Sequence, residues 1–310
     1  MTDIFNFMAY RLIKSTEEDL WSISREKDLL TDDDIVTFWE NACHSQYDVT
    51  HSTEKNKYKW SFRKGTSVTD NNDHRLIDIY ILGKSLLEKD AMVVDETGFH
   101  QDRSYSQPAP ADTMTLLVFW KRHIVLVENR SQMITGETWL KHYSEIMVRV
   151  AEKMDYKKMP QLENIPPEKS IVSIFYNLLK VTRIKLHLEL PNPDMSRLTK
   201  ELKEKLEEDQ IQELKQDMYN PNGMSKKETG LPFASLALAE LGYKKGPVTI
   251  EGEDEEGPKK YETGKDTAKG SLIGFKNFIK GLRINAKTKE GNGMLDAIEA
   301  ELIRIVPTDD

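Results

Sequence analysis

A run of basic residues near the end of the chain offers the clearest chemistry in this sequence. Seven cations and one acid, Asp266, lie between residues 265 and 289, which gives this segment a formal charge of +6 in a chain whose total is −8. Lysine and arginine bind phosphates, and each such contact releases counterions from a nucleic acid. The sequence therefore predicts a nucleic-acid interface made by Lys265, Lys269, Lys276, Lys280, Arg283, Lys287 and Lys289.

The placement of these cations depends on a strand expected over residues 279–286. Arg283, Asn285 and Lys287 alternate along it, so they should share one face and could follow a phosphate backbone. Aromatic side chains nearby, Tyr261 and Phe275 among them, could stack on bases or pack in the core. The alternative is a solvated face whose lysines only keep the protein in solution.

Other chemistry has weaker signals. The seven histidines include no His-x₃-His pair and no His-Glu-x-x-His, so no metal site is expected. The stretch from Gly257 to Asp266 has six residues between its two glycines and an aspartate where a phosphate-binding loop needs a hydroxyl. We therefore predict no nucleotide cofactor and no catalytic residues, and a protein that is not an enzyme is the favoured expectation.

One pattern keeps an enzyme among the alternatives. Pro193-Asp194 followed by Glu213-Leu214-Lys215 has the residue types of a metal-dependent nuclease, whose second carboxylate and lysine must lie on a strand. Here they fall in a helix expected after Pro193, with apolar residues from Leu198 to Met218 on one stripe. Capping of that helix explains Asp194 better. A protein-binding regulatory subunit, acting through the acidic remainder of the chain, is the third hypothesis.

The elements that position these residues indicate an α+β fold of antiparallel sheets with packed amphipathic helices. Strands are expected over residues 4–13, with one buried face, and over 181–190, and an apolar hairpin over 114–120 and 123–128. Residues 33–42 and 136–155 have the three-and-four spacing of helices. Residues 98–112 are expected to form a loop, because they are rich in Pro, Gln, Ser and Asp.

Length and proline content predict two domains. A single core stops growing near ~250–300 residues, and this chain has 310. Pro166-Pro167 interrupts the chain between the expected helix and the next strand, so we place an N-terminal domain at 1–165 and a C-terminal domain with the basic segment at 166–310.

Cysteine usage and hydropathy indicate a cytoplasmic protein. Cys43 is the only cysteine, which excludes an internal disulfide framework. No run approaches the ~18–20 apolar residues that a membrane helix needs, and the first residues do not resemble a signal peptide. Direct insertion into a membrane is therefore not expected.

Three stretches resemble the lambda phage exclusion family of RexA-like proteins. The opening strand reads Phe7-Met8-Ala9-Tyr10-Arg11, the hairpin over 116–128 precedes a helix with Trp139, and a charged strand and loop run from Val248 to Leu272. About half of the chain takes part, mostly through the order of its elements. The acidic run from Glu251 to Glu256 departs from that family.

The resemblance implies a function. Members of this family are sequence-independent DNA-binding homodimers, related in fold to ring-forming DNA-binding proteins such as RdgC. The expectation is a homodimer that binds double-stranded DNA in a phage-exclusion or antiphage-defence system. A membrane protein as its partner would fit such a two-component system.

Overall fold

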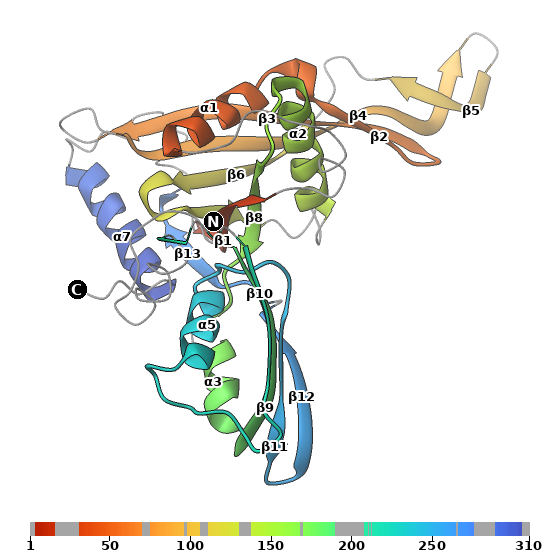
Figure 1. Ribbon diagram of the computed structural model, residues 1–310. Coiled ribbons are helices and arrows are strands. Elements are labelled where there is room, and N and C mark those ends of the chain that lie inside the picture. The colour runs from red at the N-terminus through yellow and green to blue at the C-terminus, as the bar shows by residue number, and fades with distance from the viewer. Residues whose placement is uncertain are drawn as a thin grey trace.

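Two antiparallel β-sheets, each with helices packed on it, form the protein in the computed structural model (Figure 1). The α+β fold class predicted from the sequence is confirmed. The structure describes residues 4–15, 31–69, 75–95, 98–105, 111–129, 138–167, 170–189, 208–209, 211, 213–264, 266–275 and 289–305.

The larger sheet has nine strands. Its order is β13-β1-β7-β6-β4-β3-β2, with β5 paired to β4 and β8 to β1. The long strands β3 and β4 pair along most of their length and extend beyond the rest of the sheet (Figure 1). The bounds are β1 (Ile4–Ser15), β2 (Val49–Ser52), β3 (Asn56–Thr69), β4 (Arg75–Asp95), β5 (Gly98–Tyr105), β6 (Ala111–Phe119), β7 (Ile124–Glu128), β8 (Met159–Asn164) and β13 (Lys269–Ile273).

The central strands of this sheet are buried on both faces. In β1, Tyr10 and Leu12 point into one core, whereas Phe7 and Ala9 point into the other. The expected strand over 4–13 is confirmed, but the expectation of a single buried face was wrong. Strands covered on both sides read as nearly continuous apolar runs, because successive side chains alternate between two cores.

Helices α1 (Asp32–Ala42) and α2 (Thr138–Met154) cover one face of the larger sheet. Thr31 begins α1 with a capping box, since its hydroxyl accepts from the Asp34 backbone N–H and the Asp34 carboxylate accepts from the Thr31 N–H. In α2, Tyr143 and Met147 lie on the buried stripe that the sequence predicts. No helix in the described part of the chain is long and apolar enough to cross a bilayer.

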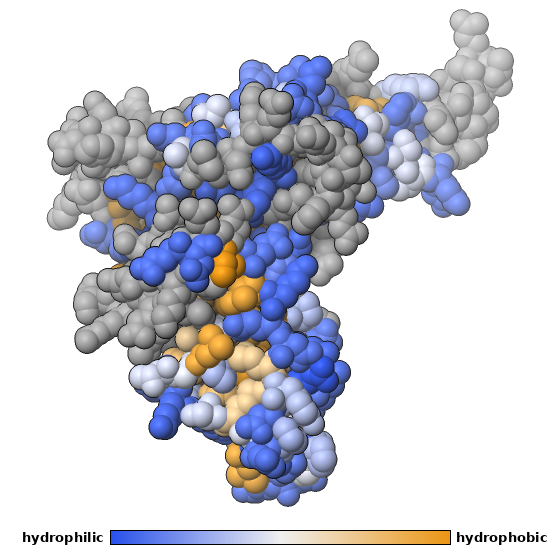
Figure 2. Space-filling view, in the orientation of Figure 1, coloured by the Kyte–Doolittle hydropathy of each residue, from blue (hydrophilic) through white to orange (hydrophobic). Residues whose placement is uncertain are grey.

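The smaller sheet has the order β10-β9-β11-β12, and the two helices described beside it, α3 and α5, pack on one face. Ile184, Leu186 and Leu188 of β9 point into this core, while Arg183 and Lys185 lie on the outer face. Apolar residues are visible at the surface over α3 and α5 (Figure 2). The bounds are α3 (Ser170–Asn177), β9 (Lys180–Glu189), β10 (Glu213–Tyr219), α5 (Leu231–Glu240), β11 (Val248–Asp254) and β12 (Gly257–Thr263).

The chain crosses from the larger sheet to the smaller one between β8 and α3, and later returns. β13 pairs with β1, and α7 (Lys289–Ile305) covers the second face of the larger sheet through Ile298 and Leu302. The crossing falls at the proline pair that marks the expected boundary. The division into 1–165 and 166–310 stays a prediction. Because β13 and α7 pack with the larger sheet, that sheet contains residues from both the N-terminal and the C-terminal part of the chain.

A buried lysine stabilises the place where the two sheets meet. Lys244 is 1% exposed and donates to Asn164 Oδ1 (3.0 Å) and to the Gly246 carbonyl (3.1 Å), with Glu163 Oε2 at 4.0 Å. Burial lowers the pKa of Lys244 and raises the pKa of Glu163, and in each case the other residue opposes the shift. Asn164 also donates to the carbonyls of Gly264 and Asp266. These bonds connect β8 with the segment before β11 and the segment after β12.

Two expected elements were wrong. Residues 98–105 form β5 and residues 111 and 112 begin β6, where a loop was expected. β5 pairs with the end of β4, from Val94 opposite Phe99 to Glu88 opposite Tyr105. Such a ribbon is specified by backbone hydrogen bonds, which leave no apolar periodicity in the sequence.

The second correction concerns residues 213–219, which form strand β10 and not the end of a helix. Leu214 and Met218 pack on the smaller sheet's core. A spacing of four residues satisfies the periods of both a helix and a strand, so these two residues could not distinguish them. The earlier part of the expected helix, from Leu198 to Leu206, lies outside the described residues.

Gly252 is the position in the smaller sheet that should tolerate a side chain least. It lies at a register shift between β11 and β9, where an added Cβ would be 2.2 Å from the Lys180 carbonyl oxygen and 3.0 Å from Leu178 Cδ1. The alanine variant should lose roughly 1–3 kcal/mol of unfolding free energy, because the backbone must move to relieve the clash.

Urea unfolding followed by circular dichroism would measure this loss. Gly293→Ala in α7 is the matched control, because its Cβ would meet nothing within 4 Å and alanine favours a helix. Equal stabilities of the two variants would contradict the close approach of β11 to β9.

Candidate functional site

Most of the basic segment predicted to bind nucleic acid lies outside the described residues. This holds for Lys265, Lys276, Lys280, Arg283 and Lys287, and for the strand expected over 279–286. Lys269 is exposed on β13, and Lys289 is the first residue of α7. The Lys269 carbonyl accepts from Arg304 of α7 at 2.9 Å. The predicted interface through these seven residues stays a prediction.

A different group of cations converges on the short helix η2 (Ser45–Tyr47) and the residue that follows it, Asp48. Arg63 of β3 binds Asp48 with both nitrogens of its guanidinium fork, at 2.8 and 2.7 Å. Lys59 Nζ lies 3.8 Å from the same carboxylate, and Arg149 of α2 donates to the Asp48 carbonyl at 2.6 Å. Two cations therefore share the Asp48 carboxylate, whose side chain is only 8% exposed, and a third cation, Arg149, binds the backbone of the same residue.

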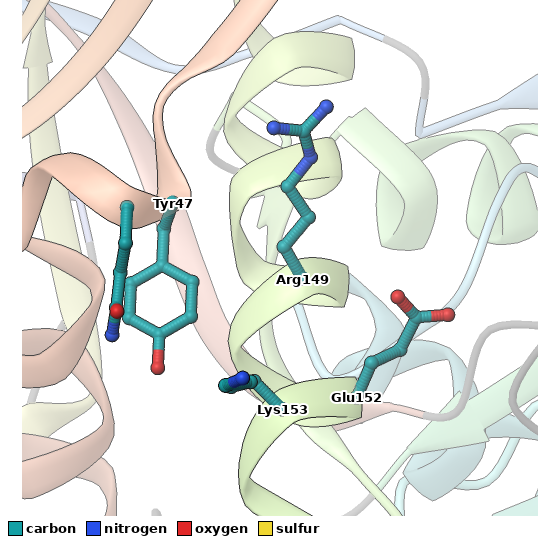
Figure 3. A pocket seen from close by; sticks show the side chains of 5 residues that line it. Tyr47, Arg149, Glu152 and Lys153 are labelled. Atoms are coloured by element: carbon teal, nitrogen blue, oxygen red, sulfur yellow. The ribbon is translucent and has the colours of Figure 1, made fainter.

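An open pocket of about 400 Å³ lies beside this group. Lys153 points toward the Tyr47 ring, Arg149 extends from the same helix, and Glu152 points away from Tyr47 (Figure 3). Lys153 is exposed and has no ion pair with any described residue. Gln46 completes the lining, which is Gln46, Tyr47, Arg149, Glu152 and Lys153.

The balance of charge at this place is positive. Four cations, Lys59, Arg63, Arg149 and Lys153, face two carboxylates, Asp48 and Glu152. We call these four cations the α2–β3 basic group. The arrangement can bind an anion at the pocket, because the Arg149 and Lys153 side chains remain exposed while Asp48 holds Arg63 in place.

The sequence alone did not reveal this group, although it contained one signal. Arg149 and Lys153 are four residues apart on the polar side of a predicted helix, so they share a face. Nothing local relates them to Lys59 and Arg63, about ninety residues earlier. They meet only because α2 packs beside η2 and β2.

A second cluster assembles at the end of the smaller sheet. Glu213 lies directly opposite Glu189, and Lys215 opposite His187, in the pairing of β10 with β9. Glu213-Leu214-Lys215 therefore lies on a strand. The prediction that these residues lie on a helix, which was the reason to disfavour the nuclease pattern, was wrong. Asp194, the other half of that pattern, lies outside the described residues.

The donor atoms of this second cluster are close together. His187, Glu189 and Glu213 each bring one ligand atom within 4.8 Å of the others, although no metal site was expected from the sequence. His187 Nε2 is 3.5 Å from Glu213 Oε2, and Lys245 Nζ is 3.6 Å from Glu189 Oε1. Burial lowers the pKa of His187, and the neighbouring Glu213 opposes this shift.

The single cysteine is unsuited to nucleophilic chemistry. Burial raises the pKa of Cys43 to about 11, with a smaller opposing effect from Arg63. The thiol therefore stays protonated near neutral pH, whereas a reactive cysteine needs the thiolate. It donates to the Trp39 carbonyl at 3.3 Å and packs against the core.

Comparison with known proteins gives a family and no function. No curated protein matches the chain. A family model described as a domain of unknown function, DUF4747, matches residues 109–270, which include Arg149, Lys153 and the His187 cluster. This match covers more than half of the 310 residues, and the chain belongs to the DUF4747 family.

Proposed function

We propose that this chain is a cytoplasmic, sequence-independent nucleic-acid-binding protein of a phage-exclusion or antiphage-defence system, acting as a homodimer. The observation that carries the binding part is the α2–β3 basic group, in which four cations face two carboxylates and two of the cations, Arg149 and Lys153, line a pocket. The defence context, the preference for double-stranded DNA and the dimer come from the resemblance to the RexA-like family.

Binding through these cations should be to phosphates and not to bases. Tyr47, the aromatic residue that lines the pocket, is 5% exposed, so little of its ring is open for a base to stack on. The exposed cations at the pocket are the ends of the Arg149 and Lys153 side chains, which recognise phosphate oxygens on any sequence, and Gln46 and Glu152 are the other exposed residues there. Affinity should therefore vary little among duplexes of equal length.

The strength of binding should fall steeply with salt. Each phosphate contact on a duplex contributes about −0.9 to the slope of log K against log salt concentration, so four contacts give about −3.6. This slope corresponds to a loss of roughly a hundredfold between 50 and 200 mM salt. Contacts by the segment from Lys265 to Lys289 would make it steeper.

The double variant Arg149→Ala/Lys153→Ala tests the site. Two lost contacts should lower the magnitude of the slope by about 1.8 and weaken binding at low salt, as measured by fluorescence anisotropy with a labelled duplex. Lys227→Ala/Lys260→Ala, two exposed lysines of the smaller-sheet unit, removes the same charge as a matched control.

The outcomes separate this interface from the predicted C-terminal one. An unchanged slope in the Arg149/Lys153 variant would overturn the role of the α2–β3 basic group. Loss of binding in a Lys280→Ala/Arg283→Ala variant alone would assign the contact to the C-terminal segment. Absence of duplex binding by the unmodified protein at 50 mM salt would remove the proposed function itself.

A further inference from the structure

The second cluster is built from residues that lie on the outer face of the smaller sheet. His187 and Glu189 are two residues apart on β9 and so share a face, and Glu213 lies across from Glu189 on β10. The side chain of Glu189 is 2% exposed, that of His187 19% and that of Glu213 30%. The cluster is thus anchored in the protein by Glu189 and open to solvent at Glu213.

Two carboxylates directly opposite each other on antiparallel strands repel and destabilise the pairing. Lys245 compensates in part, with its Nζ 3.6 Å from Glu189 Oε1. That lysine side chain is 37% exposed, so it can turn toward solvent. Glu213 has a different neighbour, the buried His187 Nε2, which has no well-formed hydrogen bond to any described residue.

We infer that His187, Glu189 and Glu213 form a binding site for a first-row divalent transition-metal ion, of the Zn²⁺ or Mn²⁺ class. Metal bonds to imidazole nitrogen and carboxylate oxygen are about 2.0–2.2 Å long, so two ligand atoms at tetrahedral positions around one ion are about 3.4 Å apart. The three donor atoms already lie within 4.8 Å of one another, and His187 Nε2 is 3.5 Å from Glu213 Oε2. Side-chain movements of about 1 Å would close the site.

The donor set selects the class of metal. An imidazole ligand disfavours Mg²⁺ and Ca²⁺, which prefer oxygen ligands alone. One nitrogen and two carboxylate oxygens suit Zn²⁺, Mn²⁺ and Fe²⁺, which accept both donor types. Three protein ligands leave a fourth position for water or a ligand, on the solvent side of Glu213.

This site is independent of the nucleic-acid proposal, because it uses other residues on the other sheet.

Metal binding can be measured on the full chain after dialysis against a chelator. Titration calorimetry with Zn²⁺, and elemental analysis of the dialysed complex, should give one ion per chain. His187→Ala and Glu213→Gln should each weaken Zn²⁺ binding at least tenfold. Lys245→Met should strengthen it severalfold, because the competing cation is removed.

Matched controls are His51→Ala and Glu256→Gln, which remove the same groups from exposed positions and should leave Zn²⁺ binding unchanged. Glu213 is partly exposed, so its glutamine variant should fold, and circular dichroism would confirm this. No bound ion in the unmodified protein, or full binding by both ligand variants, overturns the inference. Co²⁺ should also bind, with visible absorption bands that disappear in His187→Ala.

Discussion

Arg11→Ala should lower the unfolding free energy by about 3–5 kcal/mol and separate the unfolding of the two sheets. Arg11 lies on β1 and is 2% exposed. Its guanidinium donates two bonds to the Leu241 carbonyl, at 2.9 and 2.7 Å, and one to the Arg122 carbonyl at 2.6 Å. The same group lies 4.4 Å from the centre of the Tyr243 ring.

These bonds connect the larger sheet to the segment after α5 in the smaller-sheet unit. Alanine would leave two partly buried carbonyls without this donor, at up to about 1–3 kcal/mol each, and a cavity where the side chain was. Release of the guanidinium from its buried position offsets part of this cost, since burial already lowers the pKa of Arg11. The net loss of unfolding free energy is therefore smaller than the sum of the separate losses.

Urea unfolding with two signals would measure the effect. All five tryptophans precede residue 140, so their fluorescence reports on the N-terminal half, whereas far-ultraviolet circular dichroism reports on both sheets. In Arg11→Ala the two transitions should no longer coincide. Arg11→Met fills most of the volume without the bonds and should fall between alanine and the unmodified chain. Coincident transitions with a loss below 1 kcal/mol would contradict this role of Arg11.

The sequence predicted the elements whose residues carry their own periodicity. The hairpin of β6 and β7 is visible as two apolar runs, and α2 as a stripe from Trp139 to Val150, because burial fixes those residue types. β5 and β10 were missed for the opposite reason. They lie at sheet edges, where hydrogen bonding to one neighbour determines the strand and the side chains are mostly polar.

The two candidate sites differ in how much of them could be foreseen. His187 and Glu189 are two residues apart on a strand that the sequence predicts, so the sequence alone indicates that they share a face. Glu213 joins them only through the register of β10, which the apolar spacing assigned to a helix. The α2–β3 basic group depends on the packing of α2 beside η2, and packing between distant segments has no local signal.

Trp39→Ala should lower the unfolding free energy by about 3–5 kcal/mol, the range for truncation of a buried tryptophan. Trp39 lies on α1, is 0% exposed and has four ring neighbours: Phe62 (5.2 Å), Tyr80 (4.9 Å), Trp120 (5.5 Å) and Tyr143 (5.7 Å). Such pairs contribute beyond the area that they bury. Trp39→Phe keeps part of these contacts and should lose less.

The same change should also weaken the proposed nucleic-acid site. Helix α1 leads through Cys43 into η2 and Asp48, so loss of its main anchor should loosen the segment that holds Arg63 and Arg149. Duplex affinity should therefore fall in Trp39→Ala even where the protein stays folded. Phe175→Ala, in the core of the smaller sheet, should cost similar stability while leaving that affinity unchanged. Equal affinities of the two variants would mean that the α2–β3 basic group does not need the order that Trp39 provides.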